Sequence, residues 1–300
     1  MSVNRGLWVP LNGNVGTTPT EARLVTAGQV AENAPGVPRQ GLLFQSATEV
    51  VAGTSAMEYT VAACHPVISR AVNDGVYTLT LTGSTIVPTT VAPATGSRWD
   101  LVFVKQNDTA KGDADNLPIV GVVQGVASST PSKPYGSVPE GAMVLAEVSV
   151  QAGAIATNGS GVTITQMWRH TAMRGAPIPV RSKAERDEIT AYRGARVLRL
   201  DFGGLEQRFS GAKWHGSVVA GGTFTVPAVP NGGGSGNLSV TYPFTFPGAP
   251  AVTVTASSGR LTGTTTSRTS SGFVAVFDNR SGGGSSSALA TYTAIYTLAD

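Results

Sequence analysis

Apolar and polar residues alternate along much of the first half of the chain. In VYTLTLTG (76–83) the tyrosine and both leucines fall on one face of an extended segment, and the threonines fall on the other. This period of two predicts a strand with one buried face. Four further segments have the same character: RWDLVFVKQ (98–106), PIVGVVQGV (118–126), AMVLAEVSV (142–150) and GVTITQMW (161–168).

The segments between these predicted strands are rich in Gly, Asn, Asp and Pro, which supply the backbone dihedrals of turns. No long segment of helical period alternates with the strands, so a βαβ architecture is not expected. The fold of residues 1–60 stays open. TEARLVTAGQVAENAPG (20–36) and SATEVVAGTSAMEYTV (46–61) each fit either strands or helices of one to three turns.

After Gly216 the same alternation returns, and Gly/Ser-rich loops such as NGGGSGN (231–237) separate the segments. Five or six strands in the last 84 residues predict a small antiparallel β-sandwich. The whole chain is therefore expected to be all-β. The predicted strands of this region are GTFTVPA (222–228), NLSVTYPFTF (237–246), PAVTVTAS (250–257), SGFVAVFDN (271–279) and LATYTAIYTL (289–298).

Between the two β-rich regions, residues 174–216 hold 14 of the chain's 39 charges. A stiff Gly-Ala-Pro-Ile-Pro spacer opens this joint. Ser182 followed by Glu185 fits a capping box, which predicts a short helix that ends near Ala191.

A hairpin is predicted next, with Gly203-Gly204 as a two-residue turn. Its apolar face then carries Leu198, Leu200, Phe202, Leu205 and Phe209 together with Gln207, and this face needs a partner. Direct pairing opposes Asp201 to Glu206 and Arg199 to Arg208, which are unfavourable like-charged pairs. Two explanations stay open, a slipped register or charges that meet another subunit.

Composition limits the class of protein. Charged residues make up 13% of the chain, against about 25% in an average domain, and 300 residues suffice for two ordinary domains. The net charges of residues 1–173, 174–216 and 217–300 are −2, +4 and +1, so a sequence pI near 9.1 does not describe a basic face and nucleic-acid binding is not expected. Cys64 is the single cysteine, which excludes an intrachain disulfide.

No apolar run reaches the length of a signal peptide or a membrane span, so we expect synthesis in a cytoplasm, no membrane insertion, and incorporation into a particle released by lysis. His65, His170 and His215 are far apart and form no ligand motif. The oxygen-rich loop with Asp108, Asp113, Asp115 and Asn116 lacks the spacing of an EF-hand and is expected to be a solvated loop rather than a Ca²⁺ site. We predict no catalytic residue, cofactor or metal.

With catalytic, metal and cofactor sites not expected, ligand binding is the function that we consider next. Sugars are bound by aromatic faces and by planar polar side chains that make directed hydrogen bonds. Paired carboxylates for glycoside hydrolysis are lacking, since the last region offers only Asp278 and Asp300. The candidate ligand-binding residues are Tyr242, Arg260, Arg268, Asp278, Asn279, Arg280 and Tyr292.

The joint, which ends in FSGAKWHG with a G-x-x-W pattern, resembles the neck module of phage tail-fibre and minor tail proteins. FPGAPAVTVTA (246–256), SGFVAVFDN (271–279) and YTAIY (292–296) resemble receptor-binding sandwiches at fibre tips, including those similar to H-type lectins, although the polyglycine loops depart from the lectin pattern. RWDLVFVKQNDTAKGDADNLPIVGVVQG (98–125) resembles the attachment region of actinobacteriophage tail proteins.

The resemblance implies an attachment domain (1–173), a trimerisation neck (174–216) and a receptor-binding sandwich (217–300). The chain is then a non-enzymatic virion protein, a homotrimer attached to tail-tip or baseplate proteins and directed at a host glycan or envelope component. A purely structural baseplate or collar protein and a cell-wall glycan hydrolase are the alternatives. The expected trimer contacts are Leu198, Leu200, Phe202, Leu205, Phe209 and Trp214.

Overall fold

The computed structural model describes residues 16–43, 45–280, 282–285 and 287–299. Residues 1–14, whose sequence has no apolar run of signal-peptide length, and Asp300 lie outside the described residues. The chain divides into two compact units. Unit 1 comprises Met1–Val180 with Asp187–Thr190, and unit 2 comprises Arg181–Arg186 with Ala191–Asp300. The three-part division at 174 and 217 stays a prediction.

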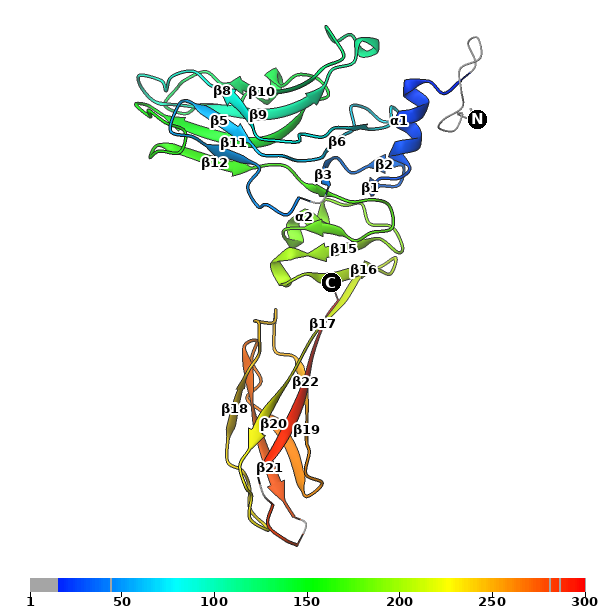
Figure 1. The fold of residues 1–300 in the computed structure, drawn as a ribbon, viewed down its shortest axis with the longest axis vertical. Coiled ribbons are helices and arrows are strands. Elements are labelled where there is room, and N and C mark those ends of the chain that lie inside the picture. Colours follow the sequence, from blue (N-terminus) through cyan, green and yellow to red (C-terminus); the bar gives the residue numbers. More distant parts are fainter. Residues whose placement is uncertain (1–15, 44, 281, 286, 300) are drawn as a thin grey trace. The chain divides into compact units, whose positions relative to one another are not determined.

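A four-stranded antiparallel sheet of order β10-β9-β11-β12 forms the centre of unit 1 (Figure 1). Its strands are β9 (Ser97–Gln106), β10 (Pro118–Gln124), β11 (Met143–Gln151) and β12 (Val162–Gln166). All four coincide with segments predicted from alternation. Residues 100–105 of β9 are buried on both faces, which explains their nearly continuous apolar sequence.

Two smaller sheets complete unit 1, with strand orders β4-β5-β8 and β13-β3-β6-β7. The first packs Val51, Tyr59 and Val87 into the same core as Leu145 and Trp168. Their strands are β3 (Gly41–Leu43), β4 (Val51–Gly53), β5 (Glu58–Val61), β6 (Pro66–Ile68), β7 (Tyr77–Thr78), β8 (Thr85–Pro88) and β13 (His170–Thr171). The remaining elements are β1 (Glu32–Ala34), β2 (Val37–Pro38), β14 (Ile178–Val180) and the 3₁₀-helices η1 (Thr109–Lys111) and η2 (Tyr135–Ser137).

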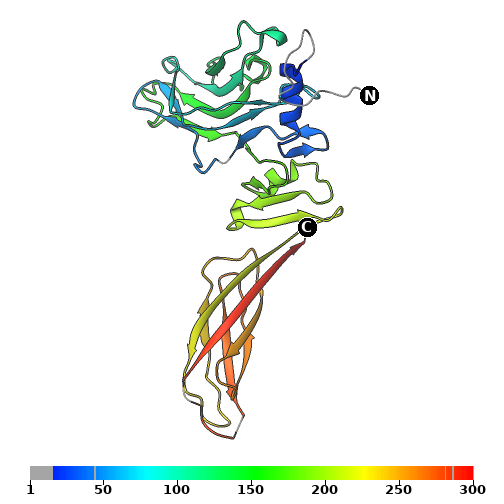
Figure 2. The same cartoon turned by 45° about the vertical axis from the view of Figure 1, so that its right-hand side comes forward.

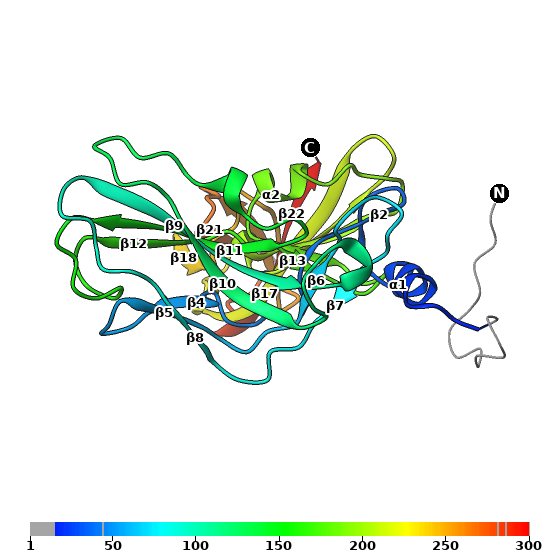
Figure 3. The same cartoon turned by 90° about the horizontal axis from the view of Figure 1, so that it is seen from above.

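The segment 20–36, which sequence left open, begins with helix α1 (Pro19–Ala27). Thr18 Oγ1 accepts from the Glu21 N–H at 3.2 Å, while Glu21 Oε2 accepts from the Thr18 N–H at 2.9 Å, and Pro19 follows the cap. Arg23 donates to Asp74 at 3.2 Å, which holds α1 near β7 at the edge of the unit (Figure 3).

Unit 2 contains a sandwich of two antiparallel sheets. One has the order β17-β22-β19 and continues through β16 to β15, and the other has the order β18-β21-β20. Figure 2 shows β17 and β22 as two long adjacent strands. The strands are β17 (Trp214–Val226), β18 (Leu238–Thr241), β19 (Ala251–Ala256), β20 (Leu261–Thr266), β21 (Gly272–Asn279) and β22 (Ala288–Ala299).

The joint departs from its prediction in helix length and hairpin register. Helix α2 (Lys183–Asp187) ends before Ala191, although the Glu185 N–H donates to Ser182 Oγ at 3.1 Å as the capping box requires. Strands β15 (Arg196–Arg199) and β16 (Leu205–Phe209) pair with Arg199 opposite Leu205, so the turn spans 200–204 and includes η3 (Leu200–Phe202). The direct register with a two-residue turn is wrong, and the slipped register is the one observed.

The slipped register has a physical cause in unit 2. Arg186, which is 1% exposed, donates to Gln207 Oε1 at 3.0 Å and lies over the ring of Trp214. Arg199 also turns inward, where it donates to Gln207 Oε1 at 3.3 Å and to Asp201 at 2.8 Å. Buried cations are stable only when they are paired and hydrogen-bonded, so these contacts select the register.

The predicted all-β class is confirmed, since α1 and α2 are the only α-helices among the residues that the structure describes. Within that part of the chain, neither helix has the length and apolar character that crossing a membrane requires.

Candidate ligand-binding surface

Three loops meet at the end of the sandwich where β17 finishes, residues 227–237, 257–260 and 280–287. The Gly232 N–H donates to the Asn279 carbonyl at 2.7 Å, and the Ser285 N–H donates to the Val229 carbonyl at 3.0 Å. Arg260 Nη1 donates to the Gly284 carbonyl at 2.9 Å. These bonds tie the loops together, and we call this surface the loop end.

Asn279 fixes the loop end to the core of the sandwich. It follows Phe273, Ala275 and Phe277 in the inward positions of β21, and its side chain is completely buried. The side-chain amide donates to the Val229 carbonyl at 3.0 Å and to the Gly283 carbonyl at 2.9 Å. A buried amide that satisfies two loop carbonyls gives a Gly/Ser-rich surface a defined position.

The predicted binding residues Tyr242, Asn279 and Tyr292 are buried, so their side chains are not presented to a ligand. The two tyrosine rings lie 6.0 Å apart, and both contact Phe273. Burial raises the pKa of Tyr242, whose hydroxyl has no hydrogen-bond partner among the described residues. They form the aromatic core of the sandwich, and Asn279 has the anchoring role described above.

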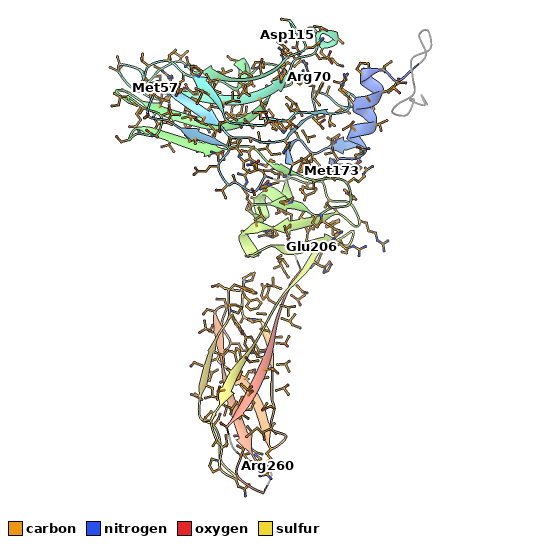
Figure 4. All side chains as sticks on the ribbon, viewed as in Figure 1. Met57, Arg70, Asp115, Met173, Glu206 and Arg260 are labelled. Carbon is orange, nitrogen blue, oxygen red and sulfur yellow. The ribbon has the colours of Figure 1, made fainter. Side chains whose placement is uncertain are left out.

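The other four predicted residues divide between the two ends of the sandwich. Arg260, Asp278 and Arg280 lie at the loop end, where Arg260 is labelled in Figure 4. Asp278 and Arg280 form a loose ion pair at 3.7 Å, and Arg280 is 87% exposed. Arg268 lies in the loop that joins the opposite ends of β20 and β21. Two guanidinium groups and one carboxylate are therefore available at the loop end.

A second surface was missed by sequence reasoning, although alternating threonines in β19 and β22 signal it. Three neighbouring strands have no charged side chain at their outward positions over most of their length. These stretches are 217–225 in β17, 289–297 in β22 and 251–255 in β19. Val219 and Ile295 are directly opposite each other and are 57% and 42% exposed. We call these positions the threonine face: Ser217, Val219, Gly221, Thr223, Thr225, Ala251, Thr253, Thr255, Leu289, Thr291, Thr293, Ile295 and Thr297.

The predicted trimer-neck residues have different environments. Leu205 and Trp214 are buried within unit 2, where the ring of Trp214 lies 5.3 Å from that of Phe209. Leu200 is 42% exposed. Leu198, Phe202 and Phe209 are half-buried. Their own unit thus covers much of the apolar face that sequence left without a partner.

The acidic loop 107–117 of unit 1 uses its carboxylates internally. Asp113 accepts from Arg70, which is labelled in Figure 4, and from Lys105 at 2.6 Å. These two cations hold the pKa of Asp113 well below its usual range. Asp108 accepts from Tyr77 at 2.6 Å, and burial with this bond raises the pKa of Tyr77 to about 12. Carboxylates paired with cations in this way organise the loop. No group of three or more metal-ligating side chains occurs in the described part of the chain.

No protein-family model matches the chain, and no curated protein is significantly similar to it. Among solved structures, the chain is similar to an N-truncated R1-type pyocin tail fibre (18% identity, 39% of this chain and 98% of that chain, TM-score 0.24). It is similar to recombinant discoidin II of Dictyostelium discoideum (8% identity, 85% of this chain and 87% of that chain, TM-score 0.24). A C-terminal part of the R1 pyocin fibre of P. aeruginosa also matches (12% identity, 99% and 96%, TM-score 0.22). TM-scores this low do not establish a common fold.

Proposed function

We propose that this chain is a non-enzymatic component of a phage tail or tail-like fibre that presents its C-terminal sandwich to the host surface. The N-terminal region attaches the protein to tail-tip or baseplate proteins. The loop end carries the proposal. Asn279 holds two Gly/Ser-rich loops in place, and Arg260 ties the third loop to the Gly284 carbonyl. Arg260 and Arg280 stay exposed on these loops, next to the half-buried Asp278 at the end of β21. The sequence resemblance of residues 246–296 to fibre-tip sandwiches supports the same function.

The proposed ligand is a glycan or another polar component of the host envelope. Arg260 and Arg280 offer planar arrays of donors, and Asp278 offers acceptors, which together suit hydroxyl and amide groups of sugars. A surface of this size binds weakly, and several copies on one particle strengthen attachment through avidity.

We propose a homotrimer for the assembled protein. The threonine face supports it, because a charge-free sheet face with Val219, Leu289 and Ile295 exposed can be buried without desolvating ions. Light scattering during size-exclusion chromatography of the full chain tests this. We expect three times the monomer mass of 30.6 kDa, and a monomer for the Ile295→Asp variant, which would bury three carboxylates. A monomer for the unaltered chain at micromolar concentration contradicts the trimer.

Cell binding tests the host-directed function. Fluorescently labelled full chain is mixed with actinobacterial cells and with unrelated cells, and the bound fraction is measured. We expect saturable binding to some of the former and none to the latter. Equal or absent binding to all cells refutes the receptor role and favours the structural baseplate or collar alternative.

A further inference from the structure

A small pocket lies beside the turn that joins β16 to β17. Its volume is about 270 Å³, and it is lined by Arg193, Arg208, Phe209, Ser210 and His215. All five belong to unit 2. Three of the five side chains carry nitrogen donors, and none is a carboxylate.

Strand register brings the nitrogen-bearing side chains of this pocket together. Arg208 on β16 lies directly opposite His215 on β17, and Arg196 faces Arg208 from β15. Like charges in directly opposed positions destabilise a sheet. Arg196 is compensated by Glu206, whose Oε1 accepts from Arg196 Nε at 2.7 Å.

The two arginines that line the pocket are not neutralised by a carboxylate of the described residues. Residues 191–217 contain five Lys or Arg and two Asp or Glu, a net charge of +3. Both acids are engaged elsewhere, Asp201 by Arg199 and Glu206 by Arg196. Among the described residues, Arg193 and Arg208 have no ion pair or hydrogen bond with a carboxylate. Within the described part of the chain, positive charge therefore accumulates at the pocket without a carboxylate partner.

The turn brings further donors to the same pocket. Ser210 Oγ lies 3.1 Å from His215 Nε2, and it accepts from the Lys213 N–H at 3.2 Å. Gly211, with φ of 106°, lets the chain pass beside the stem of Arg193, where a Cβ on the glycine would lie 3.8 Å from Arg193 Cβ. The hydroxyl, the imidazole and two guanidinium groups consequently line one cavity.

From this arrangement we propose that the pocket binds a phosphate group. Guanidinium groups match phosphate oxygens in bidentate pairs. Two exposed guanidinium groups that line one pocket with an imidazole and a hydroxyl offer enough donors for the several oxygens of a phosphate. A volume of about 270 Å³ admits such a group together with a small substituent. The site is separate from the loop end, so it does not depend on the proposed receptor function.

Isothermal titration calorimetry of the full chain tests this site. The ionic strength of the buffer is kept constant with a chloride salt. Inorganic phosphate is one probe, and glycerophosphoglycerol, a small phosphodiester, is the other. We expect saturable binding of at least one probe. Binding of inorganic phosphate alone assigns a free phosphate or monoester, whereas binding of the diester assigns a phosphodiester polymer as the source, and either result supports the site.

Variants identify the pocket. Arg208→Gln and Arg193→Gln should each weaken binding about tenfold or more, because each removes a charge-assisted hydrogen bond. Arg268→Gln is the matched control, since Arg268 is an exposed arginine of the sandwich that belongs neither to the pocket nor to the loop end, and it should leave binding unchanged. Near-ultraviolet circular dichroism checks that the variants fold. The absence of saturable binding for both probes, or equal loss in the control, overturns the proposal.

Discussion

At the scale of single residues, Asn279 decides how well the loop end is ordered. Asn279→Ala removes both amide bonds and leaves the carbonyls of Val229 and Gly283 with one donor fewer. We expect the free energy of unfolding of unit 2 to fall by about 1–3 kcal/mol. Urea denaturation of the full chain measures this. Asn237→Ala, at an exposed position in the same loop system, should change it by less than about 0.5 kcal/mol, and equal effects would show that Asn279 is not an anchor.

The hydroxyl groups of Tyr59 and Tyr242 are both buried, and we expect their removal to affect stability in opposite ways. Tyr59 Oη donates to the buried Asp100 at 2.7 Å, so Tyr59→Phe should destabilise unit 1 by about 1–3 kcal/mol. The Tyr242 hydroxyl is buried without a partner among the described residues, so Tyr242→Phe should leave the stability of unit 2 unchanged or raise it. Thermal unfolding of both variants gives the comparison. A large loss in Tyr242→Phe would reveal a hydrogen bond for that hydroxyl.

At the scale of elements, the acidic loop 107–117 predicts sensitivity to low pH. The pKa values of Asp108 and Asp113 are lowered in the folded chain by hydrogen bonds from Tyr77 and from Arg70, respectively. Their stabilisation is therefore complete above the unfolded pKa of about 3.9 and is lost as the pH falls toward the lowered values.

We expect the melting temperature of unit 1 to be level from pH 7 to about 5 and to fall below about pH 4. Asp113→Asn should lower the melting temperature at pH 7 and flatten this dependence. Tryptophan fluorescence measures it, with Asp278→Asn in unit 2 as the control. An unchanged pH profile in Asp113→Asn would mean that Lys105 and Arg70 do not stabilise the loop through this carboxylate.

Strand pairing in the sandwich depends on one close approach. A Cβ on Gly272, the first residue of β21, would collide with the backbone carbonyl of Val240 on β18. Gly272→Ala should destabilise unit 2 by about 1–3 kcal/mol, because backbone atoms in a sheet cannot move aside. Gly259→Ala is the control, since nothing lies within 4 Å of the corresponding position. Denaturation midpoints compare the two, and equal midpoints contradict the packing described.

Local pattern predicted most elements where apolar residues alternate, but the predicted strand 76–83 forms only β7 (Tyr77–Thr78) and an isolated bridge at Leu81. β9 to β12 and β22 match their predicted segments. Exposure alternates along β12 and β22, whereas β9 and β11 are buried on both faces over most of their length. β20, with the sequence LTGTTT, was missed because it has almost no apolar residue. The register of β15 and β16 depends on Arg186, a partner outside the hairpin that local sequence does not reveal.

At the scale of the whole molecule, residue type alone could not separate the proposed ligand surface from the core. Tyr242 and Tyr292 have the chemistry of a sugar site, yet their strand positions place them inside the sandwich. Arg260 and Arg280 are exposed in loops at one end of the sandwich, as is usual for charged side chains on loops, and Asp278 is half-buried at the end of β21, where it pairs with Arg280. The threonine face appears only when three strands are aligned in register.

The central claim is that the loop end contacts the host cell. The most direct test uses a bacterial strain to which the labelled, unaltered full chain binds. Binding of an Arg260→Ser, Arg280→Ser double variant to this strain is compared with binding of Arg268→Ser, which lies at the opposite end of the sandwich. We predict at least about tenfold weaker binding for the double variant and unchanged binding for Arg268→Ser. Full binding by the double variant, with all proteins equally folded, would contradict the account.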